Sequence, residues 1–165
     1  MKEKLKHYTK EIFVFFIVMT IFMNIVSLYK GQDLNKDSLN QNNITLMDSK
    51  NYSFANDKPV LIHFWASWCK ICKLEAQNIQ TISENFEVVS IAVNSGTNDD
   101  IKAYMNDKQL NFKVVNDEDG FYAQKFNIAV YPTTFIYDKN KELVFSEVGF
   151  TSTWGLWLRM WWASL

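Results

Sequence analysis

Residues 60–75 read V-L-I-H-F-W-A-S-W-C-K-I-C-K-L-E, and this stretch decides the fold of the 165-residue chain. The apolar run at 60–65 is long enough for a β-strand and too short to span a membrane. Only a strand buried on both faces tolerates such a continuous run, which indicates a central parallel strand of an α/β fold. Cys69 and Cys72 follow with C-x-x-C spacing and open a stretch with helical character.

The spacing of these two cysteines predicts thiol–disulfide exchange. A Cys pair at a strand-to-helix junction places its first sulfur at a helix N-terminus, where free backbone N–H groups and the helix dipole favour a thiolate. The chain has 2 Cys in all, so the pair is either catalytic or half of a metal site. A zinc site usually requires four N or S ligands, and only His63 and His7 remain as histidines. We therefore expect a redox-active pair, with no metal and no other cofactor.

The N-terminal segment has the pattern of a membrane anchor. Residues 1–11 are rich in lysine, and residues 12–29 carry no charge. At about 1.5 Å per residue the uncharged segment reaches roughly 27 Å, just enough to cross a bilayer core. The preceding lysines favour a cytoplasmic N-terminus, and the absence of a convincing cleavage site favours an uncleaved anchor over a removed signal peptide. We expect a cytoplasmic tail at 1–11, a transmembrane anchor at 12–29, a linker at 30–43 and an exported domain at 44–165.

Helical and strand-like segments alternate through the rest of the chain. A hairpin is expected over 44–54, strands at 88–93, 112–115, 130–137 and 142–148, and helices from 99 and over 121–126. The helix after the Cys pair has a core-facing stripe with spacings of 3 and 4, formed by Cys72, Glu75, Ile79, Ile82 and Phe86.

The C-terminal residues 151–165 form one further predicted helix. Large apolar side chains recur in it at helical spacing: Trp154, Trp157, Leu158, Trp161 and Leu165. We favour a final helix that covers one face of the sheet, with these tryptophans in core or surface packing. Contact with a membrane interface is the alternative, because Trp-rich amphipathic helices do both.

The segment around the Cys pair resembles the active-site segment of the thioredoxin superfamily, F-W-A-x-W-C-x-x-C. The matching residues are Phe64, Trp65, Ala66, Trp68, Cys69 and Cys72. From residue 44 to about 149 the chain is similar to the membrane-tethered TlpA/ResA branch, and its end resembles the ScsD-like members. This resemblance implies a thioredoxin-like α/β fold, a central mixed β-sheet with helices on both faces. It also implies an extracytoplasmic thiol–disulfide oxidoreductase on the bacterial inner membrane, with a single-pass anchor and a periplasmic catalytic domain.

Roles follow for the residues of the motif. Cys69, nearer the exposed helix start, is the expected nucleophile, and Cys72 is the resolving thiol. Glu75 matches an active-site glutamate of ResA-like proteins and is either a proton acceptor for Cys72 or a glutamate that reaches solvent. By analogy, Pro132 is the family's cis-proline, opposite the disulfide. His63 stands where thioredoxin carries a buried aspartate and is either a satisfied core histidine or a proton relay.

Five further residues are expected to frame the site: Trp65, Trp68, Lys70, Tyr131 and Thr133. Two of them depart from the family pattern. Lys70-Ile71 replaces a dipeptide that commonly contains proline, and the cation beside Cys69 favours its thiolate and raises the reduction potential. Tyr131 precedes the proline where a smaller residue is frequent. Both departures bear on the direction of the redox reaction.

Three function classes follow from these observations. The favoured one is a reductase of client-protein disulfides that takes electrons from a membrane donor. The second is a disulfide-forming oxidant or isomerase on the same fold, and the third is a non-enzymatic module whose thiols bind copper. The formal net charge of −1 gives no reason to expect nucleic acid as a partner.

Overall fold

The computed structural model describes residues 2–37, 39 and 43–165. The chain divides into two compact units, Met1–Gln32 and Asp33–Leu165. The first unit is a single helix, α1 (Lys2–Lys30). Within it, Lys10–Ser27 has a mean hydropathy of 1.8 and is, among the described residues, the one helical segment long and apolar enough to cross a membrane.

The second unit is built on a five-stranded mixed sheet with the strand order β5-β4-β3-β6-β7. Strand β3 (Val60–Trp65) pairs in parallel with β4 (Glu87–Val93), which pairs in parallel with β5 (Lys113–Asp117). On its other side, β3 pairs antiparallel with β6 (Thr133–Tyr137), and β6 with β7 (Leu143–Val148). Every residue of β3 is buried, which confirms the predicted central strand.

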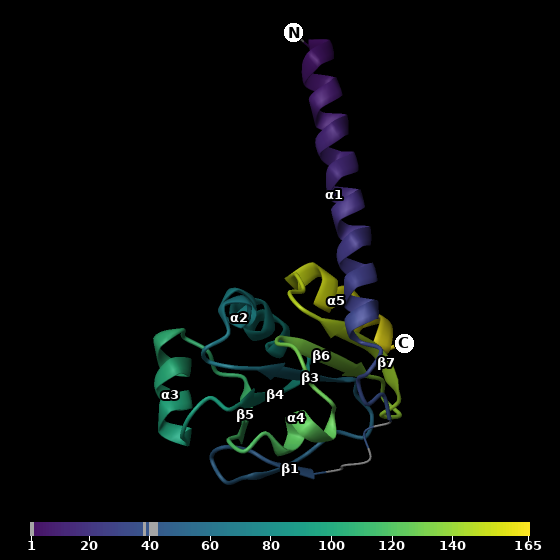
Figure 1. Ribbon diagram of the computed structural model, residues 1–165. Coiled ribbons are helices and arrows are strands. Elements are labelled where there is room, and N and C mark those ends of the chain that lie inside the picture. Colours follow the sequence, from purple (N-terminus) through teal and green to yellow (C-terminus); the bar gives the residue numbers. More distant parts are fainter. Residues whose placement is uncertain (1, 38, 40–42) are drawn as a thin grey trace. The chain divides into compact units, whose positions relative to one another are not determined.

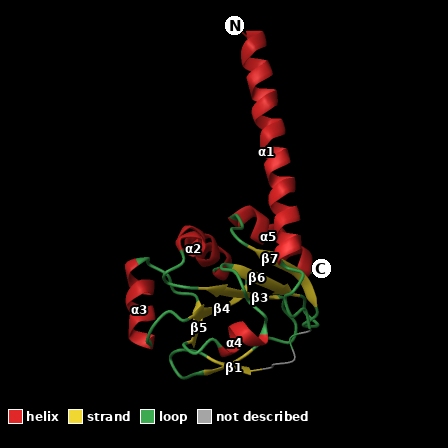
Figure 2. Cartoon of the chain, in the orientation of Figure 1, coloured by secondary structure: helices red, strands yellow, loops and turns green. Residues whose placement is uncertain are grey.

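Helices cover both faces of this sheet, as Figures 1 and 2 show. On one face lie α2 (Lys70–Ser83) and α5 (Thr153–Ala163), with α3 (Asn98–Asp107) beside the β5 edge. On the other face lie α4 (Phe121–Lys125) and the hairpin of β1 (Asn43–Thr45) and β2 (Asn51–Ser53). The predicted thioredoxin-like α/β architecture is confirmed.

Each face of the sheet has its own apolar core, because side chains alternate along β3. Leu61 and Trp65 join the cluster beneath α2, α3 and α5, whereas Ile62 and Phe64 join the cluster on the α4 side. His63 has the same parity as Leu61 and Trp65 and therefore belongs to the α2 face.

The stripe predicted for α2 is buried as far as the helix extends. Cys72, Glu75, Ile79 and Ile82 are all buried. The helix ends at Ser83, so Phe86 lies beyond it and packs partly buried against the same cluster. The prediction was wrong only in extending the stripe past the end of the helix.

The domain begins at Asp33 rather than at Ile44, because part of the expected linker packs on it. Leu34 and Leu39 are buried in the cluster on the α4 side of the sheet. The backbone N–H of Asn35 donates to the carbonyl of Phe126 at 3.1 Å. Residues in both halves of the expected linker, 30–43, therefore pack on the domain.

Helix α5 covers the sheet with small and medium-sized side chains rather than with its tryptophans. Its buried residues are Leu156, Met160 and Ala163. The large apolar residues singled out in the sequence are exposed: Trp154, Trp157, Leu158, Trp161 and Leu165. At 3.6 residues per turn, this exposed set lies opposite the buried one. The predicted final helix over one sheet face is confirmed, and of the two kinds of packing expected for its tryptophans the structure shows the surface one.

Candidate active site

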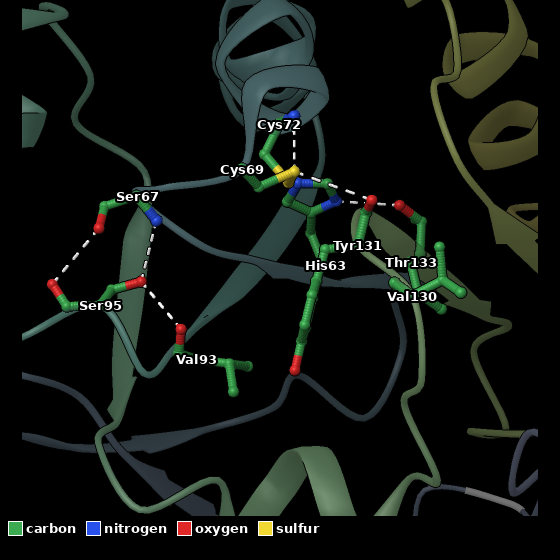
Figure 3. The surroundings of a disulfide bond; sticks show 10 residues. His63, Ser67, Cys69, Cys72, Val93, Ser95, Val130, Tyr131 and Thr133 are labelled. Carbon is green, nitrogen blue, oxygen red and sulfur yellow. Dashed lines mark hydrogen bonds between the residues drawn. A yellow bond between two sulfur atoms is a disulfide. The ribbon is translucent and has the colours of Figure 1, made fainter.

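The two cysteines lie at the N-terminus of α2 and form a disulfide (Figure 3). Cys69 is the N-cap residue, and its Sγ accepts the backbone N–H of Cys72 at 3.2 Å. That N–H is one of the helix donors without a partner inside the helix, so it would stabilise a thiolate at Cys69 once the pair is reduced. Both cysteines belong to the core cluster; Cys69 is 8% exposed, and Cys72, one turn inside, is 2% exposed.

The loop before β6 lies opposite the disulfide. The Tyr131–Pro132 peptide bond is cis, and the carbonyl oxygen of Tyr131 is 3.8 Å from Cys69 Sγ. Thr133 follows directly in β6, and its hydroxyl donates to the carbonyl of Val130 at 2.7 Å (Figure 3). The structure thus brings Tyr131 and the Cys pair together.

Only one of the two tryptophans predicted to frame the site is exposed. Trp68 packs edge-to-face against Tyr131 with 5.7 Å between ring centroids, and its indole N–H donates to the carbonyl of Asn94 at 3.0 Å. Trp65 is instead buried in the core, where its indole N–H donates to Ser90 Oγ at 3.1 Å. Trp65 therefore supports the strand end rather than the surface of the site.

The loop that carries the first cysteine is held by residues that the sequence analysis missed. Ser95 Oγ accepts the backbone N–H of Ser67 at 3.0 Å and donates to the carbonyl of Val93 at 3.0 Å (Figure 3). Ser95 follows the parallel neighbour of β3, so both strands end at the same edge of the sheet. In the sequence, the only indication of this role is that Ser95 is a polar residue just after β4.

Glu75 lies on the core-facing side of α2 and is buried rather than turned toward solvent. Its side chain is 0% exposed, and its Oε1 accepts the backbone N–H of Thr151 at 2.8 Å. Oε2 has no hydrogen-bond partner in the described part of the chain. Burial raises the pKa of this carboxyl group to about 8, although the Thr151 N–H opposes the shift. The carboxyl group therefore titrates in the range in which thiols titrate.

His63 is also buried, at 2% exposed. Its Nδ1 lies 2.9 Å from Thr134 Oγ1 on the neighbouring strand β6. Burial lowers the pKa of the imidazole to about 3, so the ring is neutral at physiological pH. Its hydrogen bond fits a satisfied core histidine, and its sheet face is the one that α2 covers.

The other charged residue of the motif, Lys70, is exposed on the first turn of α2. Its ammonium group is one residue from Cys69 and open to solvent. Over residues 2–37, 39 and 43–165, no group of three or more His, Cys, Asp or Glu side chains is placed to hold a metal ion.

A mixed five-stranded sheet with a C-x-x-C disulfide at the start of the helix after its central strand defines a thioredoxin-like protein. Comparison with known proteins agrees with this class. The chain belongs to the AhpC/TSA family, whose model matches residues 30–146.

Proteins similar to this chain have names that belong to the same functional class. A thioredoxin-like protein of Haemophilus influenzae is 33% identical over 160 residues, which cover 92% of this chain and 90% of the relative. The thiol-disulfide oxidoreductase ResA of Bacillus subtilis is 28% identical over 135 residues, covering 78% of this chain and 72% of the relative. Among solved structures, a thiol:disulfide interchange protein from Chlorobium tepidum matches with a TM-score of 0.66 and 22% identity over 81% of this chain and 99% of that one. The predicted class, a thioredoxin-like thiol–disulfide oxidoreductase, is confirmed.

Proposed function

We propose that this protein is anchored in the bacterial inner membrane by α1 and reduces disulfides of client proteins on the extracytoplasmic side. The observation that carries the proposal is the asymmetry of the Cys pair. Cys69 Sγ accepts the backbone N–H of Cys72 in the first turn of α2, whereas Cys72 lies one turn inside and is the less exposed of the two, at 2% against 8%. A pair with one activated and one shielded thiol suits attack on an external disulfide followed by internal release.

The proposed reaction has two exchange steps. The Cys69 thiolate attacks one sulfur of the client disulfide, the client S–S bond breaks, and the other client sulfur leaves as a thiolate. Cys72 then loses its proton and attacks Cys69 Sγ, which releases the second client thiolate and leaves the Cys69–Cys72 disulfide. The client gains two electrons, and the pair loses two. A membrane dithiol donor would reduce the pair again.

Glu75 supports the second step. Cys72 must become a thiolate inside the core, where desolvation disfavours the charged form. Glu75 lies one turn further along α2 on the same buried stripe. Its raised pKa of about 8 matches its carboxylate form in basicity to a thiolate, and this form becomes populated as pH rises toward 8. We propose that it receives the Cys72 proton.

Export and anchoring rest on the apolar part of α1 and on the lysines before it. Protease added to intact spheroplasts is expected to digest the domain from Asp33 onward. Complete protection of the domain until the membrane is lysed would contradict export.

The reduction potential of the Cys69–Cys72 couple tests the direction of the reaction. Equilibration of the full chain with glutathione buffers is expected to give a value of about −270 mV or below, as for a reductase. The second candidate is a disulfide-forming oxidant, favoured by the exposed cation of Lys70 beside Cys69. A potential near about −120 mV would replace the reductase proposal with this one.

A further inference from the structure

We propose that the exposed face of α5 binds the surface of the lipid bilayer, an inference that rests on the proposed anchoring by α1. This tryptophan face consists of Trp154, Trp157, Leu158, Trp161, Trp162 and Leu165. It lies on the helix side turned away from the buried Leu156 and Met160. None of these six side chains belongs to either core cluster or contributes to the Cys pair.

The exposure of these side chains is large for residues of their size. Trp154 is 77% exposed, Trp162 is 61% exposed and Leu165 is 71% exposed. Water contact with so much clustered apolar surface is unfavourable, and contiguous patches of this kind mark interaction sites. A single exposed apolar residue would need no such explanation.

The chemistry of the tryptophan face matches the interfacial zone of a bilayer. In the described part of the chain, the four α5 indole N–H groups have no hydrogen-bond acceptor, so each can bind a lipid headgroup or carbonyl oxygen while its ring enters the acyl boundary. Residues 149–165 contain no Asp or Glu, so no acidic side chain on this segment repels anionic lipids. The one cation, Arg159, pairs with Glu147 at 2.7 Å and does not make the face polar.

Chain connectivity keeps the domain close to a membrane that α1 would cross. The apolar segment ends at Ser27, and the compact domain starts at Asp33. Even fully extended, the chain between them reaches only roughly 20 Å at about 3.5 Å per residue. The bilayer surface is therefore at a high local concentration for every apolar patch on the domain. This argument favours lipid over a soluble partner as the occupant of the tryptophan face.

Tryptophan fluorescence can test the contact in the full chain. The sequence has 6 Trp, at positions 65, 68, 154, 157, 161 and 162, so α1 contains none and all emission comes from the domain. The chain is reconstituted into phosphatidylcholine–phosphatidylglycerol vesicles whose acyl chains carry bromine, a contact quencher. We expect a loss of at least about half of the emission, since four of the six Trp lie on α5. Bromines near the headgroup should quench more than bromines near the chain end.

Matched variants separate the tryptophan face from the active site. Trp154→Gln/Trp157→Gln/Trp161→Gln should lose most of the quenching, while Trp68→Phe, a change beside the Cys pair, should keep it. The single variants Trp154→Gln and Trp157→Gln should each lose part of it, which keeps the test valid if the triple variant fails to fold. Flotation with the vesicles reports the anchor independently, and disulfide reduction in a standard insulin assay reports the proposed function independently.

Wild-type protein that floats with the vesicles but shows no quenching would overturn the inference. Undiminished quenching in the triple variant would overturn it as well. Cysteine-directed cross-linking between copies through Trp157→Cys, in place of lipid quenching, would assign the face to self-association instead.

Discussion

The backbone N–H of Thr151 donates to Glu75 Oε1 at 2.8 Å, which ties the buried carboxyl group of the disulfide helix to the segment that enters α5. A second contact runs in parallel, from Asn78 Nδ2 to the carbonyl of Thr151 at 3.0 Å. The C-terminal helix is thus attached to the helix that carries the Cys pair at the residue proposed to move a proton. Glu75, His63, the Cys pair and the loop that holds Cys69 each lead to measurable expectations.

Glu75→Gln is expected to change the pH dependence of stability. Burial raises the pKa of Glu75 from 4.5 to about 8, so between these values the folded chain holds a proton that the unfolded chain has released. Stability therefore falls as pH rises through this window, by up to about 1.4 kcal/mol per pH unit. Gln does not titrate and its carbonyl can accept the Thr151 N–H. The free energy of unfolding of the oxidised protein, measured by urea denaturation from pH 4 to pH 9 in steps of about one unit, should be less pH-dependent in the variant.

Glu75→Gln is also expected to slow disulfide exchange by about tenfold to a hundredfold near neutral pH, because general acid–base groups contribute on this scale or above. The rate of resolution of a mixed disulfide should be measured by stopped flow over pH values about 5 to 9, which bracket the carboxyl and thiol titrations. Glu84→Gln serves as the matched control, because Glu84 is the C-cap residue of α2, at the end of the helix away from the Cys pair. Equal rates for wild type and Glu75→Gln across this range would return Glu75 to a structural role.

His63→Gln should act on the acid side. Burial lowers the pKa of His63 from 6.5 to about 3, so the unfolded chain binds a proton in this window that the folded chain excludes. Wild-type stability therefore falls as pH decreases below about 6.5, and the variant should lose less stability there while keeping a partner for Thr134. Melting temperatures compared at about pH 4 and pH 7 give the readout. A larger acid loss in the variant than in wild type would be incompatible with a neutral buried imidazole.

The two cysteine variants should behave differently toward client disulfides. With Cys72→Ser the mixed disulfide at Cys69 cannot be resolved, so covalent complexes should accumulate on non-reducing electrophoresis. With Cys69→Ser few should form, because the remaining thiol is buried and desolvation disfavours its thiolate. Trapping by Cys69→Ser alone would reverse the assigned roles.

Ser95→Ala is expected to destabilise the domain and slow exchange together. The change removes the acceptor of the Ser67 N–H and the donor to the Val93 carbonyl, at a cost of about 1–2 kcal/mol. Ser53→Ala, which removes an exposed hydroxyl contact to Asn43 on the hairpin, is the matched control and should cost less. Denaturant unfolding and the exchange rate of both variants provide the comparison. Exchange at the wild-type rate in Ser95→Ala would show that Ser95 does not position the loop.

The central strand and the Cys pair could be predicted because local sequence determines them. A continuous apolar run needs burial on both faces, and C-x-x-C at a strand end needs a helix start. The burial of Glu75 also followed from its spacing to Cys72. Its partner Thr151 could not be predicted, because a backbone N–H leaves no mark in the sequence and the contact joins segments far apart in the chain.

The errors came from reading apolarity without tertiary context. Leu34 and Leu39 are isolated in a polar stretch, so no periodicity indicated that they pack on the domain. In α5 the tryptophans have the strongest apolar signal, yet the smaller Leu156 and Met160 fit against the sheet and α2. Side-chain volume and available space decided that orientation, and neither can be derived from hydropathy alone.

Both cysteines of the chain belong to the reactive pair, and neither core cluster needs a disulfide elsewhere to hold it together. The sheet, its helices and the hydrogen bonds of the Ser95 loop therefore hold the domain without a structural disulfide. Such a chain can acquire its tertiary structure in a reducing or an oxidising compartment alike. The oxidation state of the Cys pair then decides which direction of disulfide exchange the enzyme can start, without removing a bond on which the rest of the domain depends.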